Sequence, residues 1–235
     1  LHHLYPTGGV VKAYRYLDLI TALFVTVLIV SNIASTKVVL LGPFTFDGGT
    51  VLFPLAYIFG DVLTEVYGYK RSRRVIWTGF FLLFLATLTF SLVNALPSPK
   101  DQDSQTFAQA FSTLFGLTPR IVLGSLLAYF LGEFANAFVL AKLKIATRGR
   151  FLALRTIGST LVGQLLDTGV FLLVAFLGVW PNELLWSVFV SNYVFKVGVE
   201  ALMTPFTYAV VGFLKRREQE DYYDYQTDFN PFRLT

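Results

Sequence analysis

Charged side chains recur inside stretches of this sequence that are otherwise apolar. A charged side chain at the centre of a lipid bilayer costs about 2.5–3.5 kcal/mol on insertion scales. Such residues are therefore expected to face a protein interior or a wet cavity, where they pair with each other or meet a ligand. The set comprises Asp61, Glu65, Glu133, Asp167, Glu200, Lys37 and Lys196.

Amide side chains accompany two of these acids at helical spacing. Asn136 follows Glu133 by three residues, and Gln164 precedes Asp167 by three, so each pair would share one helix face. A carboxylate accepts two adjacent donors, while an amide both donates and accepts. These groups suit a guanine-like edge, on which N1–H and an amine lie beside O6. They would equally suit a cationic amine, a sugar or an ion, and the residues alone leave these alternatives open.

A polar stripe also runs along the last apolar stretch, where Asn192, Lys196 and Glu200 follow one another at intervals of four. We expect Lys196 and Glu200 to set the charge of a binding site or to neutralise each other. Asn32, four residues before Thr36, is a further candidate from the first stretch. Polar residues also join membrane helices without binding a ligand, at about 0.6 kcal/mol on average.

Two further acids, Asp61 and Glu65, are four residues apart and lie just before a basic run that begins at Lys70 and ends at Arg74. Their spacing predicts a shared helix face. We expect them to lie near a membrane surface and to form structural or gating ion pairs with Lys70 and Arg74.

The sequence contains few candidate residues for catalysis or metal binding. The chain has no cysteine, and its two histidines are His2 and His3. No nucleophile motif surrounds the serines of the apolar stretches, and no phosphate-binding glycine loop occurs. We therefore expect no enzyme activity, no cofactor and no metal.

The composition is that of a membrane protein. Apolar residues make up 54% of the 235 residues and charged residues 14%, against about 25% charged in soluble domains. About 20 helical residues cross the hydrocarbon core. We predict an all-α membrane protein with six transmembrane helices, the second of which begins irregularly near Pro54. The six stretches are 17–41, 50–67, 75–96, 119–143, 156–179 and 184–214.

Positive charges alternate between the connecting loops. The regions 12–15, 70–74, 142–155 and 215–217 are basic, whereas 42–49, 97–118 and 178–183 together hold only Lys100. The positive-inside rule then places both termini in the cytoplasm. The predicted organisation is an N-terminal cytoplasmic segment (1–16), a six-helix transmembrane domain (17–214) and a cytoplasmic acidic tail (215–235).

Two extramembrane pieces carry their own signals. In the outer loop 97–118, four apolar residues recur at helical spacing, with Asp103 or Ser104 as a cap. This predicts a short amphipathic helix over 104–115, either an interfacial float or a lid. The tail 218–235 is acidic and rich in tyrosine, and we expect it to be loosely ordered.

Four segments resemble the vitamin uptake transporter family, also called the queuosine precursor transporter family. They are DVLTEVYGYKRSRR from Asp61, GEFANA from Gly132, GSTLVGQLLDT from Gly158 and SNYVFK from Ser191. The resemblance covers roughly residues 14–215. It implies a six-helix inner-membrane protein, similar in size and helix count to the substrate-binding subunit of an energy-coupling-factor transporter.

The resemblance further implies uptake of 7-cyano-7-deazaguanine or 7-aminomethyl-7-deazaguanine for synthesis of the tRNA nucleoside queuosine. Glu133 and Asp167 would then bind the donor edge, and Asn136, Gln164 and Asn192 the remaining edge atoms. The expected partners are this small molecule and the lipid bilayer, with no nucleic acid. A homodimer and an ATPase module are both compatible with the sequence.

Other functions fit the same residues. One is an ion-coupled carrier of another small planar solute. Another is a substrate-capture subunit that cannot transport without an ATPase partner. A non-transporting membrane scaffold or enzyme is the third, and it predicts no cavity joining Glu133 to Asp167.

Overall fold

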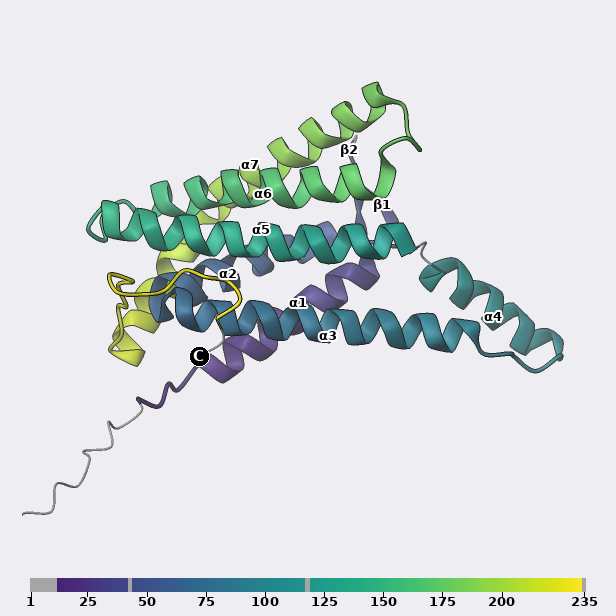
Figure 1. Cartoon of the computed structure of the whole chain (residues 1–235), viewed down its shortest axis with the longest axis horizontal. Helices are drawn as coiled ribbons and strands as arrows, with labels where there is room; N and C mark the ends of the chain where they lie inside the picture. Colours follow the sequence, from purple (N-terminus) through teal and green to yellow (C-terminus); the bar gives the residue numbers. More distant parts are fainter. Residues whose placement is uncertain (1–11, 42–43, 117–118, 234–235) are drawn as a thin grey trace, which may run out of the picture.

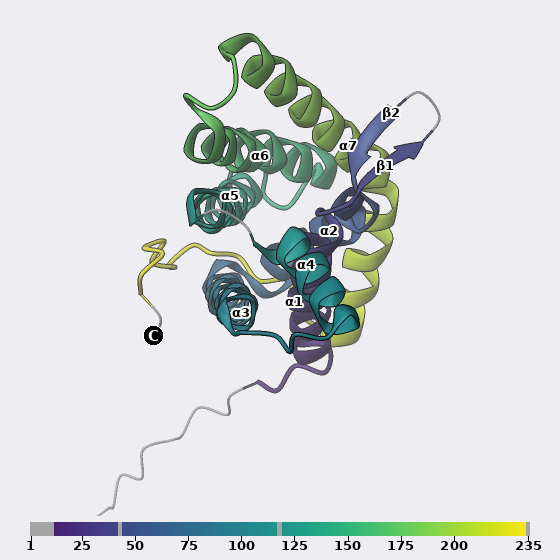
Figure 2. The same cartoon turned by 90° about the vertical axis from the view of Figure 1, so that its right-hand side faces the viewer.

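The computed structural model describes residues 12–41, 44–116 and 119–233. Helices α3, α5 and α6 lie side by side in one layer, and α1, α2 and α7 lie against one face of that layer (Figure 1, Figure 2). The elements in chain order are α1 (Leu17–Ala34), β1 (Val38–Leu41), β2 (Phe44–Asp47), the 3-10 helix η1 (Gly48–Val51), α2 (Phe53–Tyr67), α3 (Tyr69–Ala95), α4 (Gln102–Phe115), α5 (Pro119–Ala146), α6 (Leu152–Phe176) and α7 (Asn182–Glu218).

Five of these helices, α1, α3, α5, α6 and α7, are long and apolar enough to cross a membrane. The prediction of a helical membrane protein is therefore confirmed. Helix α2 has only 15 residues and starts after η1, with Pro54 in its first turn. The predicted irregular start of this segment is confirmed. Proline is suited to the first turn of a helix because a backbone N–H at that position, which proline lacks, would have no partner within the helix.

The first predicted stretch, 17–41, is too long. Helix α1 ends at Ala34, and the chain then forms an antiparallel hairpin in which Val39 pairs with Phe46. The hydroxyls of Ser35 and Thr36 donate to the carbonyls of Ser31 and Ile33. Side chains of this type compete with helical hydrogen bonding, which explains why the helix stops at this polar run rather than at Leu41.

The ends of the helices that carry the basic residues gather on one side of the molecule. The start of α1, the α2–α3 corner, the α5–α6 turn and the end of α7 lie together at the left of Figure 1. The hairpin and α4 lie at the opposite end. This arrangement agrees with the alternation of charged and uncharged loops in the sequence.

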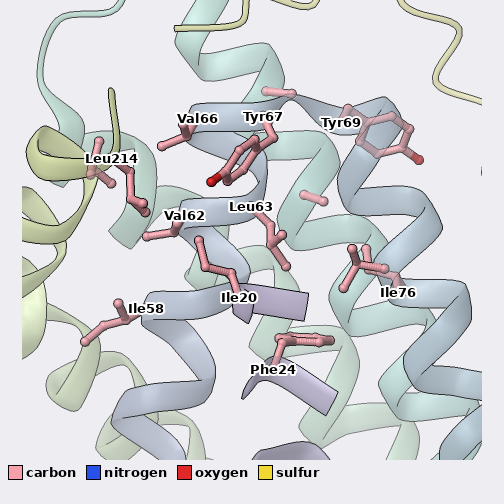
Figure 3. Close-up of a cluster of buried hydrophobic side chains, with 14 of the residues drawn as sticks. Ile20, Phe24, Ile58, Val62, Leu63, Val66, Tyr67, Tyr69, Ile76 and Leu214 are labelled. Carbon is pink, nitrogen blue, oxygen red and sulfur yellow. The ribbon is translucent and has the colours of Figure 1, made fainter. Parts of the chain in front are cut away.

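Helix α2 forms the centre of the packing. Its side chains Val62, Leu63, Val66 and Tyr67 are buried, and Ile20 of α1 lies beside them (Figure 3). The neighbouring helices are α1, α3, α5 and α7. Because lipid is as apolar as these side chains, close packing rather than exclusion of water holds such a helix in place. Residues on the polar face of α2 are consequently held at the middle of the bundle.

The predicted amphipathic helix is present as α4. Its cap is Asp101, whose Oδ2 accepts from the backbone N–H of Ser104 at 2.9 Å, rather than Asp103 or Ser104. Phe111 and Phe115 pack their rings against Phe90 of α3. These aromatic contacts explain why the apolar residues recur at helical spacing.

The expectation of a loosely ordered tail is wrong for residues 219–233. The N–H of Tyr222 donates to Val66 O at 3.2 Å, and Asp224 accepts from the N–H of Tyr69. Trp77 Nε1 donates to Pro231 O at 2.8 Å. Composition suggested disorder because the tail is polar, but the α2–α3 corner offers backbone groups without helical partners, and the tail supplies those partners.

Candidate functional site

Two glycines let helices α5 and α6 approach closely at mid-length. A Cβ added at Gly132 would lie 2.8 Å from Asp167 Cβ, and one added at Gly163 would lie 2.9 Å from Asn136 Cβ. Only glycine allows this distance, as in other small-residue contacts between membrane helices. The contact brings the polar faces of the two helices together, so the amide of α5 and the acid of α6 lie at one level.

Helix α2 adds an acid to this level. Asp61 is fully buried, and its Oδ1 accepts from Asn136 Nδ2 at 3.1 Å. One residue earlier, Gly60 faces Glu133, because a Cβ added there would lie 3.6 Å from Glu133 Oε2. The glycine leaves room for the Glu133 carboxyl between α2 and α5. Asp61 therefore lies in the interior of the bundle, and among the described residues it forms no ion pair with Lys70 or Arg74, which corrects the partners expected for it.

Asp167 finds its counter-charge across helices. Lys196 Nζ of α7 donates to Asp167 Oδ2 at 2.9 Å, and lies 3.5 Å from Thr168 Oγ1. The Lys196 and Asp167 side chains keep 22% and 29% of their surface exposed, so a ligand could reach this pair. Lys196 thus pairs with an acid of the neighbouring helix α6, whereas the spacing along α7 had suggested Glu200 as its partner.

Glu200 lies against Asp61 instead. It is 1% exposed, and its carboxyl is within hydrogen-bonding reach of the Asp61 carboxyl. Within the described residues, no hydrogen bond is donated to Oε1 or Oε2 of Glu200 or to Oδ2 of Asp61. Among the same residues, no ion pair involves Asp61, Glu133 or Glu200. Asp61 and Glu200 are thus buried and Glu133 is half-buried, and none of the three forms an ion pair with a cation among the described residues.

Tyr57 is the residue that sequence reasoning missed. It is buried on α2, and Asp61, Glu133, Asp167 and Glu200 all lie within electrostatic reach of its hydroxyl. A signal was available, because Tyr57, Asp61 and Glu65 follow one another at intervals of four. The Tyr57 hydroxyl is therefore close to acids from α2, α5, α6 and α7.

The remaining predicted ligands differ in position. Gln164 is half-buried on α6, and its Oε1 has no hydrogen-bond partner among the described residues. Asn192 is half-buried but bonds the carbonyl of Val188 in its own helix. Asn32 bonds Leu28 O in the same way and lines a small, mainly apolar cavity with Thr36, Leu114 and Phe115. That cavity lies between α1, α3 and α4, so the structure does not bring Asn32 to the acids.

Glu65 belongs to a second, quite different group at the basic end. Its carboxylate binds Arg155 through two hydrogen bonds, at 2.7 Å and 3.2 Å, and Lys215 at 2.8 Å. Lys144 lies 3.7 Å from it and also donates to Asp221 and to Tyr222 O. We call Glu65, Arg155, Lys144, Lys215 and Asp221 the ionic network.

The ionic network corrects the partners expected for Glu65. Lys70 and Arg74 are exposed, and neither forms an ion pair with a described residue. Local sequence favoured them because they are near in the chain, but they point away from the bundle. The cations that do neutralise Glu65 come from α5, α6 and α7, at least 79 residues further along the chain.

The side chains at the site offer groups for recognising a ligand. The described residues contain no group of three or more His, Cys, Asp or Glu side chains arranged to hold a metal ion. What the arrangement offers is carboxylate acceptors, an amide and one lysine–aspartate pair around a phenol. These can accept hydrogen bonds from a planar donor edge and can hold a proton.

Comparison with known proteins gives two agreeing results. Residues 47–210 match the family described as "Putative vitamin uptake transporter". The chain is also 38% identical, over 182 residues, to the "Probable queuosine precursor transporter" of Bacillus subtilis (strain 168), in an alignment covering 76% of this chain and 77% of that protein. No solved structure matches the chain.

Proposed function

Because this chain belongs to the vitamin uptake transporter family, we propose that it imports a queuosine precursor, 7-cyano-7-deazaguanine or 7-aminomethyl-7-deazaguanine. It is a transporter rather than an enzyme, and a multi-pass protein of a bacterial membrane. One observation carries the choice of substrate: the relative, 38% identical over 77% of its own length, is named for queuosine precursors.

The geometry supports this substrate class. Glu133 accepts from N1–H and the exocyclic amine of the deazaguanine, since a carboxylate offers two oxygens to adjacent donors. Asp167, held by Lys196 at 2.9 Å, lies on the facing helix. Gln164, whose Oε1 lacks a described partner, and Asn136 complete the edge, with Asn192 flanking them. Glu200 sets the charge of the site without touching the substrate.

The proposed topology has six crossings with both termini in the cytoplasm. Helix α2 supplies the sixth crossing together with η1, although its 15 residues alone are shorter than a typical span. The gathering of the basic loops at one end supports this orientation through the positive-inside rule. The hairpin and α4 then face outward.

Uptake of labelled 7-cyano-7-deazaguanine by cells expressing Glu133→Gln or Asp167→Asn tests the proposed site. Each loses a charged acceptor, which is worth about 1.5–3 kcal/mol or roughly 10–100-fold in binding. Glu183→Gln, on an exposed position of α7, is the matched carboxyl-to-amide control and keeps wild-type uptake. Normal uptake by both site variants would remove the proposed site.

A second variant separates binding from folding. Asp167→Asn leaves Lys196 without its counter-charge, so part of any loss could reflect misfolding. The double variant Asp167→Asn with Lys196→Gln removes both charges, keeps the Tm near wild type, and still fails to take up substrate.

Reconstitution addresses the rival of a capture subunit. Purified protein alone in liposomes accumulates or exchanges the labelled deazaguanine if it is a complete transporter. Binding without any exchange would instead support a subunit that needs an ATPase partner.

A further inference from the structure

Asp61 and Glu200 form a pair of acids that, within the part of the chain that the structure describes, makes no ion pair with a cation. Asp61 lies on α2 and Glu200 on α7, and their side chains are 0% and 1% exposed. Three of their four carboxyl oxygens receive no hydrogen bond from the described residues, and the fourth, Asp61 Oδ1, accepts from Asn136. The two carboxyl groups nevertheless lie within hydrogen-bonding reach of each other.

Ionised carboxylates cannot donate, so two of them in contact would only repel. One added proton changes this, because a protonated carboxyl donates to its neighbour and the pair then carries a single charge. Two acids sharing one site behave in this way in proteins generally. The contact between α2 and α7 is therefore satisfied when the pair holds one proton.

The surroundings reinforce this inference. Tyr57 of α2 and Glu133 of α5 lie within electrostatic reach of the pair, and Asp167 of α6, bound to Lys196 of α7, lies within reach of Tyr57. Lys196 is engaged by Asp167 at 2.9 Å. The positive charges nearest along α2 belong to the ionic network around Glu65, which is one helical turn away and already paired.

We propose that Asp61 and Glu200 are a proton-binding site that couples substrate import to the proton gradient across the membrane. This rests on the proposed import of a deazaguanine. The link to the substrate is Asn136, which donates to Asp61 and lies beside Glu133 on α5. A substrate that recruits the Asn136 amide withdraws a hydrogen bond from Asp61 and so changes how firmly the pair holds its proton.

The proton balance of the cycle is simple. The pair takes one proton from the outer side, so that Asp61 and Glu200 together carry one negative charge. Release of that proton to cytoplasmic water leaves two carboxylates in contact, and their repulsion separates α2 from α7. Re-protonation from outside closes the contact again, and no bond other than O–H forms or breaks.

Infrared spectroscopy of the purified protein tests the proton directly. The wild-type protein at neutral pH shows a protonated-carboxyl C=O band that shifts in D₂O, and Asp61→Asn and Glu200→Gln each reduce it. Glu183→Gln, on the same helix as Glu200 but exposed, leaves the band unchanged. Absence of the band in the wild-type protein, or an undiminished band in both site variants, overturns the proposal.

Proteoliposomes test the coupling. With the outside one pH unit more acidic, one proton per substrate supports about tenfold accumulation of 7-cyano-7-deazaguanine. Each variant is compared with itself at equal pH, and the ratio falls from about ten to about one in Asp61→Asn and Glu200→Gln. A ratio near one in the wild-type protein, or near ten in the variants, overturns the coupling.

These outcomes separate the two proposals. Wild-type protein that neither binds nor exchanges the deazaguanine contradicts the proposed function, and the infrared comparison then decides the proton site alone. Wild-type exchange that ignores the pH gradient contradicts only the coupling. For site variants that lose exchange altogether, the protonated-carboxyl band decides whether Asp61 and Glu200 hold the proton.

Discussion

Asp61 and Glu65 lie one turn apart on the same helix, and both are fully buried. Glu65 meets Arg155, Lys215 and Lys144, so that every charge in the ionic network has a partner. Asp61 meets one amide and a second acid. The same chemical group thus serves two purposes within about 6 Å of helix rise. A fully paired acid holds helix ends together, whereas an incompletely paired acid can still gain a ligand or a proton.

The difference extends to the structures around each acid. The ionic network is closed by the tail, since Asp221 receives hydrogen bonds from Lys144 at 2.5 Å and from Lys215 at 2.8 Å. The group of Asp61, Glu133 and Glu200 at mid-length, here called the acid cluster, keeps oxygens of Asp61 and Glu200 that have no hydrogen-bond partner within the described residues. Buried polar groups without partners are costly, and in a transporter their retention favours a functional role.

Glu65→Gln would break the ionic network and gives the largest expected effect. It leaves Arg155 and Lys144 buried without their shared counter-charge, at a cost of about 3–5 kcal/mol. For a chain of this size that lowers the Tm by roughly 6–20 °C. Thermal unfolding in detergent, followed by tryptophan fluorescence, measures it. Lys70→Gln is the control, because Lys70 is exposed and has no described ion pair, and a Tm loss as large as that of Glu65→Gln would contradict the comparison.

Gly163→Ala would instead disturb the acid cluster through packing. Its Cβ would lie 2.9 Å from Asn136 Cβ and 3.1 Å from Gly132 O. Overpacking of this kind costs about 1–3 kcal/mol, and separation of α5 from α6 also weakens deazaguanine binding. Calorimetric binding and thermal unfolding report the two effects. Gly212→Ala, whose Cβ meets nothing within 4 Å, keeps both values, and equal losses in the two variants would argue against the close contact.

Asp221→Asn should weaken docking of the tail without disturbing the acid cluster. The expected change in stability is the smallest of the three. Burial opposes ionisation of Asp221, but hydrogen bonds from Lys144 and Lys215 hold its pKa below the ordinary value of 3.8. A lowered folded-state pKa contributes stability that is fully present above the unfolded value and is lost as pH falls through the folded one. The contribution of Asp221 to docking of the wild-type tail is therefore fully present at neutral pH and is lost as the pH falls below about 4.

Fluorescence of Trp77 reports this release, because its indole donates to Pro231 O. Trp180→Phe and Trp186→Phe remove the other two tryptophans. Asp221→Asn shifts the docking equilibrium by about 0.2–1 kcal/mol at neutral pH, as for partly exposed ion pairs. An acid transition identical in the wild-type protein and in Asp221→Asn would mean that this carboxylate does not hold the tail.

Sequence patterns anticipated much of the fold because they reflect local physics. Long apolar runs predicted the membrane helices, and helical spacing of phenylalanines predicted α4. The α1 end at Ala34 was missed, since the polar run 31–37 was treated as an interruption of a span rather than its end. The docked tail was missed because its partners, such as Tyr69 and Trp77, are about 155 residues away in the chain.

For the candidate site, the sequence by itself determined which acids lie within apolar stretches and which residues share a helix face with them. Only the tertiary structure decided the pairings: Lys196 with Asp167, Glu65 with three distant cations, and Asp61 with Glu200. Spacing along one helix specifies a face, but the charge that a face meets depends on how helices pack. Here the glycines at 60, 132 and 163 set the helix separations that bring those faces together.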